Sequence, residues 1–219
     1  MNYQIDAPGS AIRTTVKLPA SKSISNRALI LNALSYSAYD VENLSDCDDT
    51  NLMVKALNSN DRDFNVGAAG TTMRFLTAFL SKVVGEWTIT GTERMKNRPI
   101  KVLVDALNAL GARIEYMEKE GYPPLRIFGS ALQGGEISLP GNVSSQYISA
   151  ILMIAPLTEN GVMLHLEGAI ISRPYIHITL QLMEQYGVRA SWTENTIKVL
   201  PQAVSYTHLR AHETGAYLV

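Results

Sequence analysis

The chain has 219 residues, of which 46% are hydrophobic and 18% are charged, and its formal net charge is -1 at pH 7. This composition is typical of a folded globular protein, and the near-neutral charge argues against a general nucleic-acid binder. The sequence contains no apolar run long enough for a transmembrane helix and no signal-peptide pattern, so we expect no membrane partner. The single cysteine, Cys47, excludes an internal disulfide and suits a cytoplasmic protein.

Apolar spacing predicts alternating strands and helices along the chain. Proline near a helix start and glycine just after a helix end mark two of the helices, with Pro99 and Gly111 on one and Pro174 and Gly187 on the other. In chain order we expect strand 14–18, helix 23–36, strand 38–43, helix 49–58, strand 63–66, helix 72–84, strand 86–90, helix 99–110, strands 113–117, 125–128 and 136–139, helix 145–156, strand 162–166, helix 174–186, and strands 188–192 and 196–200.

The chain contains an internal repeat. "NRPIKVLVDALNALGAR" (97–113) parallels "SRPYIHITLQLMEQYGVR" (172–189), and each segment follows a small-residue loop and an earlier helix. Pro99 lies 28 residues after Thr71, and Pro174 lies 28 residues after Gln146. The helices at 23–36 and 49–58 provide a third, more diverged copy. A period of this length predicts three packed units of alternating helices and strands around a common axis.

Polar and cationic residues gather at the predicted helix starts. In "LPASKSISNRALILNAL" (18–34), Ser23 and Arg27 are spaced i, i+4, and helical side chains lean toward the N-terminus, so Arg27 points back toward Lys22. A helix N-terminus carries unpaired N–H groups and partial positive charge, which favour an anion. The alternative is that the serines only cap the helix and Lys22 is solvated.

The same pattern recurs at four later positions. "GAAGTTMR" has a glycine-bearing loop, a threonine cap and Arg74, but it lacks the P-loop spacing. "RMKNRPI" (94–100) holds three cations, and arginine grips phosphate or carboxylate through paired hydrogen bonds. "SSQYIS" and "ISRPY" place hydroxyl and amide groups at the last two starts. A turn or a solvated basic loop explains any one of these alone, whereas together they predict one shared surface that binds a small, multiply anionic ligand.

These five motifs, in this order and with this spacing, resemble the 5-enolpyruvylshikimate-3-phosphate (EPSP) synthase family, over about residues 3–200. The resemblance implies an α/β (α+β) fold in which three βαβαββ-type units surround a pseudo-threefold axis and form one half of an inside-out barrel. It also implies the enolpyruvyl transfer of chorismate and aromatic amino acid biosynthesis. The sister UDP-N-acetylglucosamine enolpyruvyl transferase shares this fold, but "SKSxSNR" and "RMKxRPI" favour the shikimate enzyme.

The resemblance also implies the ligands and the residues that bind them. Lys22 would be the catalytic residue and would touch both substrates, while neither a cofactor nor a metal is expected. The shikimate 3-phosphate contacts would be Lys22, Ser23, Arg27, Ser144, Ser145, Gln146, Ser172 and Tyr175. The phosphoenolpyruvate contacts would be Lys22, Gly70, Arg98 and Gln146, supported by Thr71 and Arg74, and glyphosate would be an inhibitor.

Several features depart from the family pattern. Ala68 stands where the family often has asparagine, and His177 stands where an acidic residue is usual, so we expect a structural role for His177. The family's full enzyme is about twice this length, so we expect residues 1–204 to be its N-terminal domain, to lack the C-terminal domain, and to be inactive alone. Residues 205–219 are expected to be a non-native or read-through tail, a native tail being the alternative.

A non-catalytic ligand-binding domain and the amino-sugar transferase remain alternative functions. The acidic "DCDD" context of Cys47 predicts a raised thiol pKa, which disfavours the latter.

Overall fold

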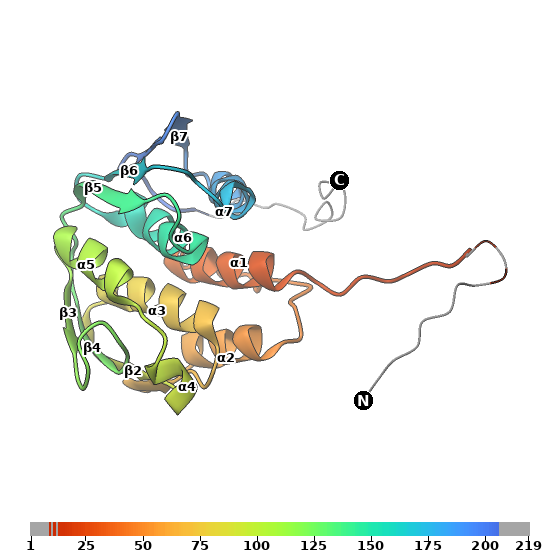
Figure 1. Ribbon diagram of the computed structural model, residues 1–219, viewed down its shortest axis with the longest axis horizontal. Helices are drawn as coiled ribbons and strands as arrows, with labels where there is room; N and C mark the ends of the chain where they lie inside the picture. Colours follow the sequence, from red (N-terminus) through yellow and green to blue (C-terminus); the bar gives the residue numbers. More distant parts are fainter. Residues whose placement is uncertain (1–8, 10, 12, 206–219) are drawn as a thin grey trace.

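The computed structural model describes residues 9, 11 and 13–205, where helices alternate with the strands of two sheets (Figure 1). The helices are α1 (Lys22–Leu34), α2 (Asp48–Leu57), α3 (Gly70–Lys82), α4 (Glu93–Lys96), α5 (Lys101–Ala109), α6 (Ser145–Ile154), η1 (Ala155–Leu157) and α7 (Arg173–Gln185). The strands are β1 (Asp63–Asn65), β2 (Gly85–Thr90), β3 (Arg113–Tyr116), β4 (Leu125–Gly129), β5 (Gly135–Pro140), β6 (Val162–Glu167), β7 (Ala190–Thr193) and β8 (Thr196–Val199). The predicted α/β (α+β) class is confirmed.

The two sheets have the same topology, which confirms the internal repeat. One has the order β1-β2-β4-β3 and the other β5-β6-β8-β7. In each, the first two strands are parallel and the remaining pairs are antiparallel. A helix links each parallel pair, because parallel neighbours need a long crossover connection. Two complete βαβαββ units therefore follow one another along the chain.

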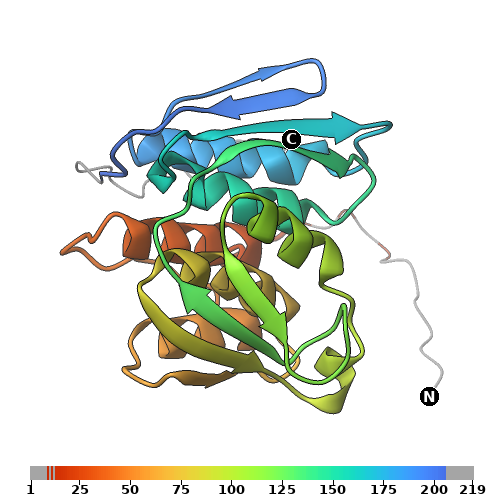
Figure 2. The same cartoon turned by 90° about the vertical axis from the view of Figure 1, so that its left-hand side faces the viewer.

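The core lies among the helices, with the sheets on the outside. Figures 1 and 2 show α1, α3 and α6 side by side, with one sheet against each of two sides of this helix layer. Leu31, Phe75 and Ile151, one from each of these helices, are fully buried. Burying such side chains supplies the main driving force for packing the two sheet-bearing units onto the helices of the first unit.

Within the described residues, the first unit consists of α1 and α2 without a sheet. The predicted strands at 14–18 and 38–43 are wrong. Residues 13–20 extend away from the body with Val16 and Leu18 exposed, so no backbone among the described residues completes a ladder with them (Figure 1). Residues 38–43 form a loop in which the Asn32 amide donates to the Tyr39 carbonyl, a local hydrogen bond that competes with strand pairing.

In the described chain, every long helix begins or ends one or two residues from its predicted bounds, and three of these differences have a clear local cause. α5 begins at Lys101, so Pro99 precedes the helix, and the short α4 forms part of the predicted basic loop. α3 begins at Gly70 after an Ala69 N-cap that has no side-chain hydrogen bond, so the predicted threonine cap is wrong. Helix 145–156 divides into α6 and the 3-10 turn η1, since Pro156 has no N–H to continue the helix.

The end of the described chain is still attached to the body. Val204 is buried, and the Ser205 N–H donates to the Tyr186 carbonyl over 3.1 Å. Apart from Ser205, the predicted tail 205–219 lies outside the described residues. None of the helices in the described part of the chain has the length and apolar character required to cross a membrane.

Candidate functional site

The starts of α1, α2 and α3 meet at the carboxylate of Asp49. The Lys22 ammonium at the start of α1 lies 3.7 Å from Asp49 Oδ2. The Thr71 backbone N–H in the first turn of α3 donates to Asp49 Oδ1 over 3.0 Å, and the Thr72 hydroxyl donates to the Asp49 carbonyl over 2.6 Å. The sequence predicted that Lys22 needs a nearby anion, and here a carboxylate of the protein itself is that anion.

The start of α6 joins the same group of helix starts. Gln146 donates from Nε2 to the Thr71 hydroxyl over 3.1 Å. Ser144 is the N-cap of α6, and its hydroxyl accepts from the Gln146 backbone N–H over 3.3 Å. The Tyr147 hydroxyl donates to the Pro99 carbonyl over 2.7 Å, which fixes the segment that follows Arg98. Four helix starts and the Arg98 segment are thus held in direct contact.

Gly70 allows two guanidinium groups to approach the start of α3. A Cβ atom at this position would lie 2.7 Å from Arg74 Nη1 and 2.8 Å from Arg98 Cζ, closer than real Cβ contacts. Arg74 donates from Nη1 to the Gly70 carbonyl over 2.7 Å, and its Cζ lies 5.3 Å from the centroid of the Tyr147 ring. Its Nε is buried without a hydrogen-bond partner. Glycine therefore leaves room for both guanidinium groups beside the backbone, and a larger residue would displace the ends of these two side chains.

The cations of this cluster repel one another. Partial burial lowers the pKa of Arg98, and the charges of Arg74 and Arg94 lower it further, against the opposing effect of Asp49. Arg98 is exposed, and so is Lys22, which leaves both heads open to solvent. Positive side chains beside the backbone N–H groups of several helix starts form a surface that a phosphate or carboxylate would neutralise.

Arg27 is directed to the protein interior. Its side chain is 2% exposed, and Nε donates to the Thr179 hydroxyl of α7, Nη2 to the Ser149 hydroxyl of α6, and Nη1 to the Ser23 carbonyl. Burial lowers the pKa of Arg27 to about 10, an effect that Tyr175 partly opposes, so the group remains charged at neutral pH. The side chain does turn back toward the start of α1, as its spacing predicted.

The remaining predicted residues lie at the same helix starts with fewer contacts to the cluster. Ser23 is half-buried beside Arg27, and Ser145 is buried in the first turn of α6. Ser172 is the N-cap residue of α7, and the exposed Tyr175 lies close enough to raise the pKa of Arg27. The start of α7 is therefore linked to the cluster through Arg27, and no direct hydrogen bond joins Ser172 to Lys22, Gly70 or Gln146 in the described chain.

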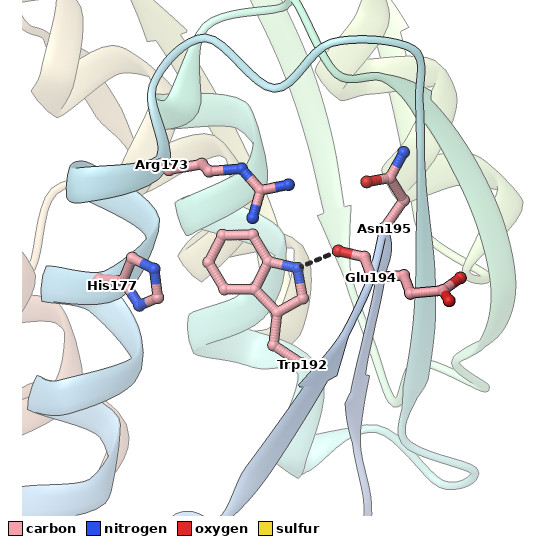
Figure 3. Close-up of a pocket in the computed structure, with 5 residues that line it drawn as sticks. All are labelled: Arg173, His177, Trp192, Glu194 and Asn195. Carbon is pink, nitrogen blue, oxygen red and sulfur yellow. Dashed lines mark hydrogen bonds between the residues drawn. The ribbon is translucent and has the colours of Figure 1, made fainter.

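The other side of the α7 start has a structural role. Figure 3 shows Arg173 and His177 of α7 facing Trp192 of the β7–β8 hairpin, with Arg173 Cζ 5.1 Å from the Trp192 ring centroid and the His177 ring centroid 4.7 Å from it. The Trp192 indole N–H donates to the Glu194 carbonyl. These contacts attach the hairpin to the helix, and the structural role expected of His177 agrees with them.

Sequence reasoning missed Asp49 as a site residue and gave Cys47 the wrong pKa direction. The acidic residues after Cys47 indicated only a helix start, and Asp49 pairs with Thr71 across 22 positions.

Burial acts to raise the pKa of Cys47, but hydrogen bonds with Thr50 and Ser45 outweigh it, so the pKa is lowered. The Cys47 sulfur lies 3.3 Å from the Thr50 hydroxyl. Neighbouring hydroxyl groups, whose orientation depends on the fold, decide this pKa.

The same motifs occur in a known family. A family model described as EPSP synthase (3-phosphoshikimate 1-carboxyvinyltransferase) matches residues 7–60 and 58–212. The chain belongs to the EPSP synthase family. Among EPSP synthase relatives, the 3-phosphoshikimate 1-carboxyvinyltransferase of Bacteroides fragilis (strain YCH46) is 60% identical over 203 residues, which are 92% of this chain and 49% of that relative. The resemblance to this family that the five motifs indicated is confirmed.

A more distant EPSP synthase relative gives the same picture. The 3-phosphoshikimate 1-carboxyvinyltransferase of Vibrio atlanticus (strain LGP32) is 41% identical over 226 residues, covering 91% of this chain and 53% of that relative. The solved EPSP synthase from Acinetobacter baumannii is similar in fold, with a TM-score of 0.77 at 20% identity over 87% of this chain and 48% of that one. The chain spans about half the length of the curated relatives it matches.

Replacing the buried guanidinium should destabilise the domain. We expect Arg27→Lys to lower the free energy of unfolding by roughly 2–4 kcal/mol, because a lysine ammonium cannot reach all three acceptors and stays buried. Urea denaturation followed by circular dichroism measures this change. Arg113→Lys, at an exposed arginine, is the matched control and should stay within about 0.5 kcal/mol. Equal stability of the two variants would contradict the structural role of Arg27.

The lowered pKa of Cys47 predicts thiolate formation at lower pH than in the unfolded chain. Because Cys47 is the single cysteine of the chain, alkylation by iodoacetamide reports on it alone. We expect the rate–pH profile of the folded chain to have a lower midpoint than the profile in urea. Thr50→Val should raise the folded midpoint by removing a hydrogen bond to the thiolate. A folded midpoint at or above the unfolded one would contradict this expectation.

Proposed function

We propose that this chain provides part of the active site that moves the enolpyruvyl group of phosphoenolpyruvate to the 5-hydroxyl of shikimate 3-phosphate. One observation carries the proposal. Lys22, Arg74 and Arg98 lie at helix starts whose backbone N–H groups are oriented for anions, and partial burial, followed by the charges of Arg74 and Arg94, lowers the pKa of Arg98. Both substrates bear phosphate and carboxylate groups, which complement such a surface. Family membership supplies the reaction class.

The family resemblance implies how the two substrates would divide the surface. We assign shikimate 3-phosphate to Lys22, Ser23, Ser144, Ser145, Gln146, Ser172 and Tyr175, with the predicted contact Arg27 acting from the interior as a support. We assign phosphoenolpyruvate to Lys22, Gly70, Arg98 and Gln146, with Thr71 and Arg74 as supports. The Gln146–Thr71 hydrogen bond joins the start of α6 to the start of α3. This contact supports the proposal that the two ligands bind next to each other, with Gln146 between them. The burial of Arg27 favours a role in holding Ser23 from beneath.

The residues of this chain would bind, orient and stabilise charge. In the addition step the 5-hydroxyl oxygen bonds to C2 of phosphoenolpyruvate, the hydroxyl proton leaves and C3 gains a proton. Elimination then reverses the proton gain at C3 and releases phosphate. Lys22, placed between the two ligands, would act by stabilising negative charge that develops on the transferring group. Arginine at position 98 would hold the carboxylate or phosphate of phosphoenolpyruvate through paired hydrogen bonds.

Because the chain spans about half of its relatives, we propose that these helix starts are one wall of a cleft and that a C-terminal domain supplies the other wall. Such a wall binds the substrates weakly and transfers nothing alone, since chemistry needs a positioned acid and base and exclusion of water. Glyphosate, which carries a phosphonate and a carboxylate, would compete at the Arg98 side. A lone cysteine also suits the cytoplasm.

Removing the charge of Lys22 should weaken ligand binding. We expect Lys22→Ala to lower the affinity for shikimate 3-phosphate by about tenfold or more, because an amine–phosphate hydrogen bond is lost. Isothermal titration calorimetry measures the affinity, and Lys55→Ala, an exposed lysine in the last turn of α2, is the control. If both variants bind like the parent chain, the site assignment is wrong, and a fold-preserving domain with another role becomes the better interpretation.

A turnover assay tests the division of labour between domains. With both substrates present, the isolated chain should release no inorganic phosphate above background. Mixing with the separately produced C-terminal half of the Bacteroides fragilis relative, 60% identical in the matched part, should restore release. Appreciable phosphate release by the chain alone would contradict the proposal that this chain forms only one wall of the active site. Phosphate release only in the mixture would support it.

A further inference from the structure

Asp49 takes the place of a missing cap at the start of α3. The N-cap residue is Ala69, whose side chain cannot accept a hydrogen bond, and the second helical residue is Thr71. The side-chain acceptor of an N-cap normally binds the N–H of the second or third helical residue. Asp49 Oδ1 binds this N–H over 3.0 Å from the first turn of a different helix, so the α3 start depends on α2 for its cap.

The second oxygen of the same carboxylate faces Lys22. The Nζ–Oδ2 separation of 3.7 Å is an ion pair but exceeds hydrogen-bond length, so Asp49 restrains the charge without using the ammonium's N–H groups. The Asp49 side chain is 18% exposed and that of Lys22 is 47% exposed, so the carboxylate is held in the protein while the ammonium remains open to solvent. A ligand anion can therefore bind Lys22 without displacing Asp49.

The chain of contacts continues beyond α3. Thr71, whose N–H is bound by Asp49, accepts from Gln146 through its hydroxyl, and Thr72 donates to the Asp49 carbonyl over 2.6 Å. Asp49 thereby has two independent attachments to α3 and one to α1, and it reaches α6 through Thr71. Its neighbour Asp48 is also in the first turn of α2 but is exposed.

From these contacts we propose that Asp49 is a positioning residue of the anion site, holding Lys22, the α3 start and, through Thr71, Gln146 in the arrangement that binds the ligand. The identity of the ligand in this inference rests on the proposed function. The arrangement of Lys22, the α3 start and Gln146 around Asp49 does not depend on it. A bound ligand then meets groups already oriented, which lowers the ordering cost of binding.

The test uses Asp49→Ala, which removes both attachments of the carboxylate, and Asp49→Asn, which keeps an acceptor for Thr71 but removes the charge. Asp48→Ala is the matched control. We expect Asp49→Ala to weaken shikimate 3-phosphate binding by about tenfold, Asp49→Asn to weaken it by a smaller factor, and Asp48→Ala to leave it within about twofold. Tighter binding by Asp49→Asn would overturn the inference, since Asp49 would then only compete with the ligand. Equal effects of Asp49→Ala and Asp48→Ala would also overturn it.

A ligand-free measurement separates this inference from the proposed function. Hydrogen exchange of the Thr71 amide, followed by nuclear magnetic resonance, should become faster in Asp49→Ala and remain slow in Asp49→Asn and Asp48→Ala. The Gln146 side-chain amide resonances should shift in Asp49→Ala only. If the parent chain binds no shikimate 3-phosphate but these changes occur, the proposed function fails and the positioning role stands. Unchanged Thr71 exchange in Asp49→Ala would refute the positioning role whatever the ligand.

Discussion

The buried guanidinium of Arg27 is the interaction on which the arrangement of the helices depends. It extends from α1 and donates to hydroxyl groups of α6 and α7, and it lies 5.3 Å from the Phe75 ring centroid of α3. These four helices belong to all three repeated units. A charge removed from water requires several well-placed acceptors, and α7, α6 and the start of α1 supply one each here. The group therefore favours a single alignment of the units and, with it, a single alignment of their helix starts.

That alignment concentrates positive charge at one end of the helices. Lys22 comes from the first unit and Arg74 and Arg98 come from the second, and they lie near the starts of α1 and α3, whose first backbone N–H groups no helix turn can satisfy. Asp49 offsets part of this charge and also caps α3, so the site is stable before any ligand is present. A ligand with phosphate and carboxylate groups would offset the remainder. The same group of side chains therefore stabilises the helix starts and provides the affinity for an anion.

Local pattern in the sequence accounts for most of the secondary structure. Between residues 13 and 205, six long helices and eight strands formed at the positions that apolar spacing predicted, with boundaries shifted by a few residues. Strands 14–18 and 38–43 failed because a strand needs a partner backbone, and the alternating pattern alone does not say whether one is available. The repeat predicted similar packed units of helices and strands, and the structure adds that the two sheets have the same strand order.

The sequence by itself determined where the helices start, to within about two residues, and which polar and cationic residues lie at those starts. It also determined the family, because the family motifs depend only on residue order and spacing. Only the tertiary structure decided which side chains meet. It buried Arg27, directed Arg173 to Trp192, lowered the pKa of Cys47 and brought Asp49 to Thr71. Each of these depends on groups distant in sequence or on hydroxyl orientation, and the energy of a hydrogen bond or ion pair is set by distance and burial that no local pattern encodes.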